Sequence, residues 1–260
     1  MAHPVKAKKH LGQHFLNDEN IAKKIVDAVL EESSPNALIE IGPGTGVLTK
    51  HLIDLPNFWA WDIDTESIEY LRNTYPDHIH KIVEGDFLKM DIDKLVGGKK
   101  LNVIGNFPYN ISSQIMFRVL EHRDQVDIVV GMFQKEVAER IAEMPGTKAY
   151  GILSVILQAF YDITYLFTVN ENVFNPPPKV KSAVIKLKRN DVKNLPCNEA
   201  LFIKVVKTTF NQRRKTIRNS IKPMLTSAMD TSSYLFEKRP EQLSVAEFVE
   251  LTKLVEAHTV

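Results

Sequence analysis

The feature that most constrains the fold is a short apolar run, Ala37–Ile41, that passes directly into Gly42-Pro43-Gly44-Thr45-Gly46 and then into a helical stretch. Glycines let the backbone approach a ligand closely, and the start of a helix supplies free amide donors. A strand, a glycine loop and a helix form the first unit of a nucleotide-binding α/β fold. We therefore predict an α/β fold with a Rossmann-like sheet. The glycines that we expect at its ligand site are Gly42, Gly44 and Gly46.

An acidic residue at a second strand end supports this fold. Asp62 follows the apolar run 58–61 and lies about 20 residues beyond the first loop glycine, where an acid accepts hydrogen bonds from ribose hydroxyls. The alternative for Asp62 is a helix cap. Asp64 fits that alternative better, because a helically spaced apolar pattern follows it. We therefore assign the ribose to Asp62 and the cap to Asp64.

A third strand end, after residues 81–84, carries Gly85-Asp86-Phe87. In a doubly wound sheet these strand ends line one crevice. Asp86 can there accept a hydrogen bond from the adenine amine of a cofactor, while Phe87 or Ile63 covers the ring. The alternative for Asp86 is an ordinary turn residue.

The fourth strand end carries an amide, a proline and an aromatic residue. Asn106-Phe107-Pro108-Tyr109 comes directly after the apolar run 101–105. The asparagine oxygen can accept from an exocyclic amine, the peptide before a proline favours extended geometry that turns carbonyls outward, and a tyrosine face can stack on a base. We interpret the segment as a site that methylates an amino group on an exposed nucleobase, with Asn106, Pro108 and Tyr109 as catalytic residues. The alternative is a turn with a core tyrosine.

A proline-rich segment, residues 173–180, is predicted to be a rigid extended loop, because its three prolines fix φ and reject both helix and central strand. Such a loop can present Phe174 as the second face of a base sandwich. The alternative is a plain linker. The next strand, residues 182–188, alternates apolar and polar side chains, so we expect it to have one wet face and to close the sheet.

A change in composition divides the chain. The polar, proline-containing passage 190–198 is taken as a domain boundary. Residues 1–189 are predicted to be a catalytic methyltransferase domain that binds the cofactor. Residues 190–260 are predicted to be a small helical RNA-binding domain, whose last helix begins with a capping box of Ser244 and Glu247.

Two stretches are basic although the whole chain is not. The formal net charge is +1, because 33 basic residues nearly balance 32 acidic ones, so only local clusters can indicate a polyanion partner. Residues 210–222 contain no acid, which favours phosphate contact over a solvated helix face. The arm formed by residues 1–10 is either a solvated tail or rests on phosphates. The residues expected to contact RNA are Lys8, Lys9, Lys179, Arg213, Arg214, Lys215 and Arg218.

Composition also excludes several partners. Cys197 is the only cysteine, so an intrachain disulfide is impossible and no thiolate metal cage can form. No metal is implied. The N-terminus lacks an apolar signal region, and no apolar run is long enough to span a bilayer. We therefore expect a soluble, cytoplasmic, monomeric protein without a membrane or metal partner.

Taken together, the motifs resemble those of the ribosomal RNA adenine dimethyltransferases of the KsgA type, over nearly the whole length. They are Leu11-Gly12-Gln13-His14-Phe15-Leu16-Asn17, Glu40-Ile41-Gly42-Pro43-Gly44-Thr45-Gly46, Asn106-Phe107-Pro108-Tyr109-Asn110-Ile111-Ser112, Gln134-Lys135-Glu136-Val137, residues 174–180 and Phe210-Asn211-Gln212-Arg213-Arg214-Lys215-Thr216. The resemblance implies that the cofactor is S-adenosyl-L-methionine. It also implies that the substrate is a pair of adjacent adenosines in the 3′-terminal hairpin loop of 16S rRNA in the 30S subunit, dimethylated at N6 during ribosome biogenesis.

The resemblance also implies a set of cofactor contacts, namely His14, Leu16, Gly42, Asp62, Asp86 and Asn106. Three positions depart from the usual family pattern: His14 stands where asparagine is common, Asp62 where glutamate is common and Phe107 where leucine is common. Asp62 is one methylene shorter, so its ribose contact needs a small backbone shift or a bridging water. The other two preserve hydrogen-bonding capacity or apolar bulk.

Three competing functions remain open at this point. A related antibiotic-resistance methyltransferase that acts on large-subunit ribosomal RNA shares the cofactor loop and the pocket, although the basic residues 210–222 favour the small subunit. A ribosome-assembly or RNA-binding factor with little turnover is a second alternative, against which the glycine loop, Asp86 and Asn106 argue. A small-molecule methyltransferase is the third, and the two basic segments speak against it.

Overall fold

The computed structural model describes residues 5–31, 36–92, 94, 97–225 and 230–258. The chain divides into two compact units. The first consists of Met1–Ala138 and Ile163–Arg189, and the second of Glu139–Asp162 and Asn190–Val260. Residues 1–4 of the predicted basic arm lie outside the described residues.

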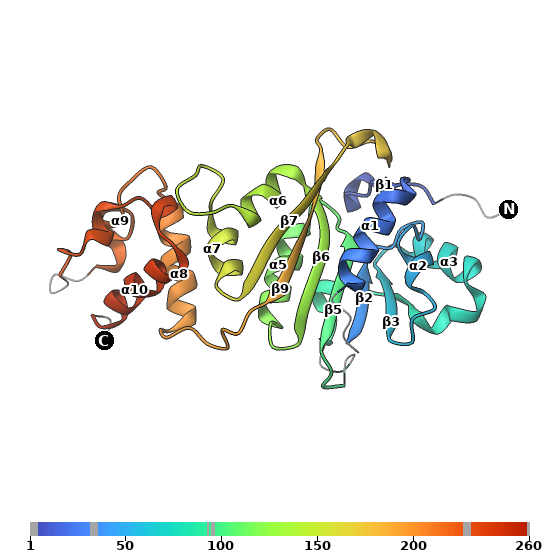
Figure 1. The fold of residues 1–260 in the computed structure, drawn as a ribbon, viewed down its shortest axis with the longest axis horizontal. Helices are drawn as coiled ribbons and strands as arrows, with labels where there is room; N and C mark the ends of the chain where they lie inside the picture. The colour runs from blue at the N-terminus through green and yellow to red at the C-terminus, as the bar shows by residue number, and fades with distance from the viewer. Residues whose placement is uncertain (1–4, 32–35, 93, 95–96, 226–229, 259–260) are drawn as a thin grey trace. The chain divides into compact units, whose positions relative to one another are not determined.

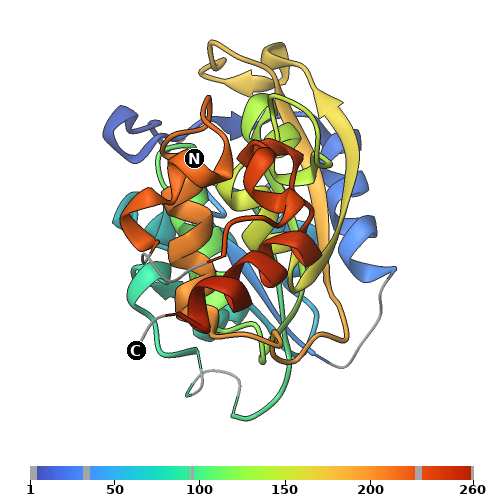
Figure 2. The same cartoon turned by 90° about the vertical axis from the view of Figure 1, so that its left-hand side faces the viewer.

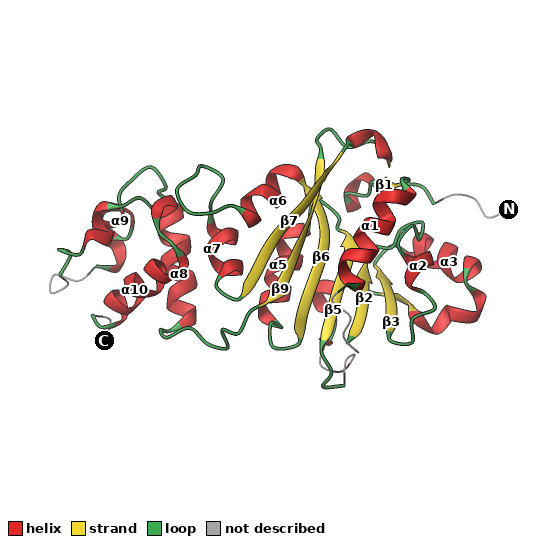
Figure 3. Cartoon of the chain, viewed as in Figure 1, coloured by secondary structure: helices red, strands yellow, loops and turns green. Residues whose placement is uncertain are grey.

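A sheet that has seven strands in the described residues organises the first unit (Figures 1 and 3), in the order β4-β3-β2-β5-β6-β9-β7. The strands are β2 (Ala37–Ile41), β3 (Phe58–Asp62), β4 (Ile82–Glu84), β5 (Leu101–Asn106), β6 (Val126–Gln134), β7 (Tyr161–Val169) and β9 (Ser182–Arg189). The first five in this order pair in parallel, and β9 pairs antiparallel with β6. Strand order reverses between β2 and β5, which is where such sheets open a crevice. The predicted Rossmann-like fold is confirmed.

The strand that was expected to close the sheet lies inside it. β9 is placed between β6 and β7, so β7 forms the edge. The predicted wet face is also wrong for most of β9, because residues 182–185 and Leu187 are buried and only Lys188 is exposed. β9 is therefore an inner strand whose first four residues are buried on both faces, and the alternating pattern that the sequence shows is confined to its last residues.

Carboxylates begin the two long helices of the first unit that follow β1 and β3. α1 (Glu19–Leu30) starts at Asp18, whose carboxylate accepts from the Ile21 amide at 3.0 Å. α3 (Thr65–Thr74) starts at Asp64, which accepts from the Glu66 amide at 3.2 Å, so the predicted cap is confirmed. Other helical elements of the described residues before residue 140 include α2 (Thr49–Leu52), α5 (Ser112–Glu121), α6 (Lys135–Ala142), η1 (Lys9–Leu11), η2 (Pro76–Lys81) and η3 (Phe87–Lys89).

The proline-rich segment is tied to the start of the chain. β8 (Phe174–Asn175) pairs antiparallel with β1 (Phe15–Leu16), and η4 (Glu171–Val173) precedes it. The Asn175–Pro176 peptide is cis. Part of the predicted loop is therefore a short strand, and its partner strand lies near the N-terminus.

The second unit is mostly helical, and its part after residue 190 is drawn in orange to red in Figure 2. Its elements in the described residues are α7 (Ile152–Gln158), α8 (Glu199–Phe210), α9 (Ile217–Ser220), α10 (Val245–Glu256), η5 (Lys222–Met224), η6 (Tyr234–Glu237) and η7 (Pro240–Gln242). The predicted capping box of α10 is confirmed: the Glu247 amide donates to Ser244 Oγ at 3.2 Å, and the Ser244 amide donates to Glu247 Oε2 at 2.9 Å.

The domain boundary differs from the predicted one. Glu139–Asp162 belongs to the second unit, although it precedes the boundary at residue 190. The physical reason is packing between segments far apart in sequence, since the Tyr150 ring lies edge-on to Phe210 with centroids 6.2 Å apart. The Gly146 amide also donates to the Glu241 carbonyl at 2.6 Å. None of the helices among the described residues is long and apolar enough to cross a membrane.

Two glycines on neighbouring strands make room for Phe107. Its ring is 1 % exposed and lies edge-on to Phe133, with centroids 5.2 Å apart. A Cβ on Gly131 would come within 2.3 Å of this ring, and one on Gly105 within 2.5 Å of the Ile41 carbonyl oxygen. Both distances are shorter than real carbon contacts, so these positions accept only glycine while the ring stays in place.

We expect Gly131→Ala to destabilise the protein by about 1–3 kcal/mol through overpacking against Phe107. The midpoint of chemical denaturation of the variant measures this. Combining Gly131→Ala with Phe107→Leu should recover part of the loss, because leucine lacks the ring atoms that the new methyl meets. A double variant that is less stable than either single variant would contradict this explanation.

Candidate active site

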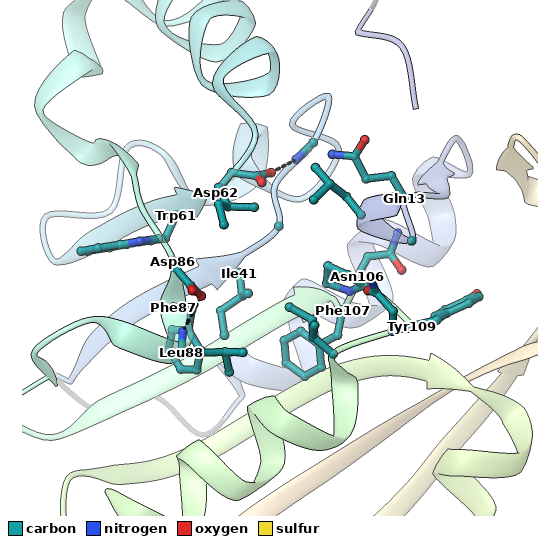
Figure 4. A pocket seen from close by; sticks show the side chains of 18 of the residues that line it. Gln13, Ile41, Trp61, Asp62, Asp86, Phe87, Leu88, Asn106, Phe107 and Tyr109 are labelled. Atoms are coloured by element: carbon teal, nitrogen blue, oxygen red, sulfur yellow. Dashed lines mark hydrogen bonds between the residues drawn. The ribbon is translucent and has the colours of Figure 1, made fainter. Parts of the chain in front are cut away.

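A pocket opens at the edge of the sheet where β2, β3 and β5 end and beside the turn after β4 (Figure 4). It holds about 930 Å³ of space free of protein atoms, its open mouth included. The lining residues are 11–15, 41, 42, 44, 61–63, 85–88 and 106–111. Five separate stretches of chain therefore meet there, as the strand ends of such a sheet should.

Ten of the residues that the sequence singled out line this pocket. They are His14, Gly42, Gly44, Asp62, Ile63, Asp86, Phe87, Asn106, Pro108 and Tyr109. Others that line it were not assigned a role, among them Gln13, Ile41, Trp61 and Leu88. The polar run around Gln13, between a glycine and Phe15, is the signal that could have marked its place in the wall.

Three residues that were predicted to contact the cofactor or the base do not line the pocket. They are Leu16, Gly46 and Phe174. Phe174 is 4 % exposed and belongs to the hydrophobic core together with Leu16, which stands opposite it in the β1–β8 pair. A Cβ on Gly46 would meet the Leu71 side chain at 2.8 Å, so this glycine faces the core. The prediction that Phe174 offers a ring face to a base is wrong for this structure, because strand pairing turns the ring inward.

The glycine loop folds back against the end of β3. Gly42 and Gly44 have φ of +69° and +54°, in the left-handed region that favours glycine. The Gly44 amide donates to Asp62 Oδ2 at 3.4 Å, and the Asp64 amide donates to Asp62 Oδ1 at 3.0 Å. Asp62 is 8 % exposed, and burial raises its pKa to about 6 although these amides oppose the shift. At neutral pH the carboxylate is mostly ionised and held by backbone amides.

Asp86 serves both as a turn residue and as part of the pocket wall. Its Oδ1 accepts from the Leu88 amide at 3.0 Å, and its Oδ2 lies 3.4 Å from Lys89 Nζ. Beside it, Phe87 is 4 % exposed, whereas Ile63, which also lines the pocket, is 53 % exposed. A planar ligand could therefore contact one fixed and one exposed apolar side chain.

Asn106, at the end of β5, is oriented by a backbone carbonyl. Its Nδ2 donates to the His14 carbonyl oxygen at 2.7 Å. Because a carbonyl oxygen can only accept, this contact determines which end of the amide carries the nitrogen. The side-chain oxygen therefore remains an acceptor, in the wall of a pocket that also contains Asp62 and Gly42 (Figure 4).

Tyr109 is held at its hydroxyl and on its ring. The hydroxyl lies 2.5 Å from Ser182 Oγ, and the ring stacks on the His14 imidazole with centroids 5.2 Å apart. His14 Nδ1 is 2.8 Å from the Pro176 carbonyl oxygen, so this nitrogen carries a proton and donates. Burial raises the pKa of Tyr109, with the Ser182 bond opposing it, so the phenol is neutral. The histidine that replaces the usual asparagine thus supports the aromatic ring.

The basic candidates differ in how their charge is used. Arg213 Nη2 donates to the Thr147 carbonyl at 3.0 Å, and Arg218 Nη2 donates to the Thr231 carbonyl at 3.0 Å and to Glu237 at 2.5 Å. Arg214 and Lys215 are exposed and, with Arg213, line a hollow formed by residues 210–215. In the first unit, Lys9 and Lys179 are exposed, whereas Lys8 is bound to Asp64.

Among the described residues, no cluster of His, Cys, Asp and Glu is arranged to hold a metal ion.

Known proteins are similar to this chain over nearly its whole length. A family model described as ribosomal RNA adenine dimethylase matches residues 5–256. The chain belongs to the ribosomal RNA adenine dimethylase family. The resemblance predicted from the motifs, and with it the assignment as an enzyme of this methyltransferase family, is confirmed.

Relatives of this dimethylase are found in several bacteria. The chain is 59 % identical to the ribosomal RNA small subunit methyltransferase A of Flavobacterium johnsoniae over 97 % of each chain. It is 56 % identical to the protein of that name from Bacteroides thetaiotaomicron, covering 97 % of this chain and 95 % of the relative.

Solved structures of related enzymes have the same fold. A dimethyladenosine transferase from Plasmodium falciparum superimposes with a TM-score of 0.75 at 26 % identity, over 92 % of this chain and 96 % of the other. The 23S rRNA methyltransferase ErmE gives a TM-score of 0.67 at 24 % identity, over 92 % and 99 %. The second likeness concerns the fold alone.

One buried acid of this dimethylase does not line the pocket. Glu40 in β2 is 1 % exposed, and its Oε2 accepts from the Thr49 hydroxyl at 2.7 Å. Burial raises the pKa of Glu40 to about 8, with Thr49 opposing the shift and the neighbouring Asp62 adding to it. Near neutral pH the folded protein therefore keeps a proton on Glu40, next to the loop that carries Gly42.

This proton makes stability depend on pH. Between the ordinary pKa of 4.5 and about 8, the folded state holds a proton that the unfolded chain has released, so stability falls as pH rises. Glu40→Gln cannot titrate. We expect the melting temperature of the variant, relative to wild type, to rise steadily from about pH 5 to about pH 8. Thermal unfolding at several pH values measures this, with Glu31→Gln on the surface as the matched control. A difference that does not change with pH would contradict the assignment of this proton to Glu40.

Proposed function

We propose that the chain transfers methyl groups from S-adenosyl-L-methionine to the N6 amines of two adjacent adenosines in the 3′-terminal hairpin loop of 16S rRNA, in the cytoplasm, as the small subunit is assembled. The observation that carries this proposal is Asn106, whose side-chain oxygen is left as an acceptor in the same pocket as Asp62 and the glycine loop. The names of the relatives support the choice of the small subunit.

The pocket wall fits the proposed cofactor. Asp62, with its carboxylate mostly ionised at neutral pH, can accept from the ribose hydroxyls. Asp86 can accept from the adenine amine, and Phe87 or Ile63, which both line the pocket, can cover the ring. The backbone at Gly42 and Gly44 allows close approach to the remaining part. The cofactor, when bound, supplies a methyl group on a positively charged sulfur, which is already a strong electrophile.

The protein's task is then to orient the target amine. The lone pair of the adenine amine is delocalised into the ring, which makes the nitrogen a poor nucleophile. Asn106 Oδ1 and the Pro108 carbonyl oxygen can accept its two hydrogens, which favours a tetrahedral nitrogen with its lone pair free. The Pro108 oxygen already accepts from the Ile111 amide at 3.2 Å, and a carbonyl has a second lone pair to offer.

Tyr109 can hold the flipped base by stacking, because its hydroxyl and its ring are both positioned by neighbours. Phe174 has no part in this arrangement, since it is a core residue. No general base is needed before transfer, because the charged product amine is acidic enough to lose its proton to water.

Asn106→Ala should lower methyl transfer by at least about 100-fold, because it removes an acceptor that acts on the reacting amine, while RNA binding stays largely intact. Transfer of a radiolabelled methyl group to unmethylated small subunits, followed by nucleoside analysis for dimethyladenosine, measures this. Asn172→Ala, an exposed asparagine in η4, is the control. Normal turnover by Asn106→Ala would refute the role of the amide.

The same assay separates the proposed substrate from its main rival. Wild-type protein should methylate small subunits and leave large subunits unlabelled. Labelling of the large subunit alone would favour the related large-subunit activity. Tight RNA binding without transfer to either subunit would favour an assembly factor.

We expect Arg214 and Lys215 to contribute more to RNA binding than their basic neighbours, because Arg213 and Arg218 donate to carbonyl groups of the protein. Arg214→Gln combined with Lys215→Gln should weaken binding to small subunits and lower the slope of log affinity against log salt by about 2. Affinity measured at several salt concentrations tests this. Lys193→Gln, which removes an exposed charge elsewhere, should leave the slope nearly unchanged.

A further inference from the structure

A short segment near the N-terminus is bound to the loop after β3, next to Asp62, the residue proposed to bind the ribose. We call residues 8–14 the strap. Lys8 Nζ is bound to the Asp64 carboxylate and lies 3.5 Å from Glu66, and Gln13 Nε2 donates to Asp64 Oδ2 at 2.8 Å. The Lys8 amide in turn donates to Gln13 Oε1 at 2.8 Å, which joins the two strap residues to each other. Lys8 and Gln13 are therefore both bound to the buried carboxylate of Asp64.

The other side of the strap is fastened to the loop that carries the proposed catalytic residues. Asn110 Nδ2 donates to the His10 carbonyl at 3.0 Å, and Asn106 Nδ2 donates to the His14 carbonyl at 2.7 Å. Contact at this point is close, since a Cβ on Gly12 would lie 2.8 Å from Asn110 Oδ1. The strap thus connects the loop after β3 with the loop after β5.

The strap also forms part of the pocket wall. Residues 11–14 line the pocket, and the Gln13 side chain extends from the Asn106 side towards the Asp62 side (Figure 4). A bound ligand that reaches from Asp62 to Asn106 would therefore lie beside the strap along most of its length.

Asp64 has more partners than a helix cap needs. Besides the Glu66 amide, its carboxylate accepts from Ser67 Oγ at 3.0 Å and from both strap residues, and its side chain is fully buried. Burial opposes ionisation of Asp64, but the bonds from Gln13, Lys8 and Ser67 outweigh it and hold its pKa below the ordinary value. A buried carboxylate that binds a lysine ammonium forms a strong, charge-assisted bond.

We propose that Asp64 and Asn110 are positioning residues that fasten the strap across the pocket and so slow the departure of the bound methyl donor. This inference rests on the proposed function. Asp64 does not line the pocket, and Asn110 lines it without being an expected cofactor contact. Each acts through the strap, Asp64 from the loop after β3 and Asn110 from the loop after β5.

The test uses the full-length protein and the dissociation rate of S-adenosyl-L-methionine. Asp64→Asn keeps a good helix cap but removes the charge that holds Lys8, and Gln13→Ala leaves the cap untouched. We expect Asp64→Asn to speed dissociation about tenfold, the size of one lost charge-assisted bond, and Asn110→Ala to speed it by up to about tenfold, the upper size of one lost neutral bond. Gln13→Ala should speed it in the same direction. Asp77→Asn, an exposed acid in η2, is the control and should leave the rate unchanged.

Combining Asp64→Asn with Asn110→Ala distinguishes one shared effect on the strap from two independent losses of cofactor binding. If both act by releasing one strap, Asp64→Asn with Asn110→Ala should be no faster than about tenfold, whereas independent effects would multiply to about a hundredfold. Trypsin should also cut after Lys8 and Lys9 faster in Asp64→Asn than in wild type. Wild-type rates in both variants, or a hundredfold effect in the double variant, would overturn the inference and leave the proposed function intact. Failure of the wild type to bind the donor would overturn both.

Discussion

The structure depends on backbone hydrogen bonds that extend the parallel sheet one residue beyond β2, β4 and β5, three of the strands that contribute to the site. The Gly42 amide donates to the Trp61 carbonyl at 3.0 Å, the Gly85 amide to the Asp62 carbonyl at 2.8 Å and the Phe107 amide to the Met132 carbonyl at 3.2 Å. The loops therefore leave the sheet only after their first residue has been positioned by the neighbouring strand. The chemistry-bearing side chains inherit the rigidity of the sheet, which loops alone do not have.

This dependence explains which features were predictable from the sequence. Strand ends, the glycine loop, Asp62, Asp86 and Asn106 follow from local patterns, because a parallel sheet brings its carboxyl ends to one edge whatever the rest of the chain does. Features that depend on distant partners were missed. The β1–β8 pair turns Phe174 into the core, and β7 rather than β9 takes the edge. The transfer of residues 139–162 to the second unit is of the same kind, since contacts such as Tyr150 with Phe210 leave no trace in either segment alone.

The basic residues also show what the sequence alone cannot predict. Residues 210–222 form a run without acids, yet in the structure its basic side chains differ in whether they bind other groups of the protein. Arg213 and Arg218 donate to carbonyl groups and pair with acids that lie elsewhere in the chain, while Arg214 and Lys215 face solvent. Lys8, at the opposite end of the chain, is similarly bound to Asp64. A basic composition therefore indicates a polyanion partner, and only the contacts show which cations are available to it.

The position of Phe107 has a consequence for the second of two successive transfers. Its ring is confined between Gly105 and Gly131, and Asn106 and Pro108 flank it directly in the chain. Both acceptor residues are therefore bonded directly to a residue whose ring is fixed in the core, which limits how far their backbone can move. On the proposed function, an adenosine that has received one methyl group has one amine hydrogen left. Only one of the two acceptors can still bind it, and the methyl group must fit beside the other.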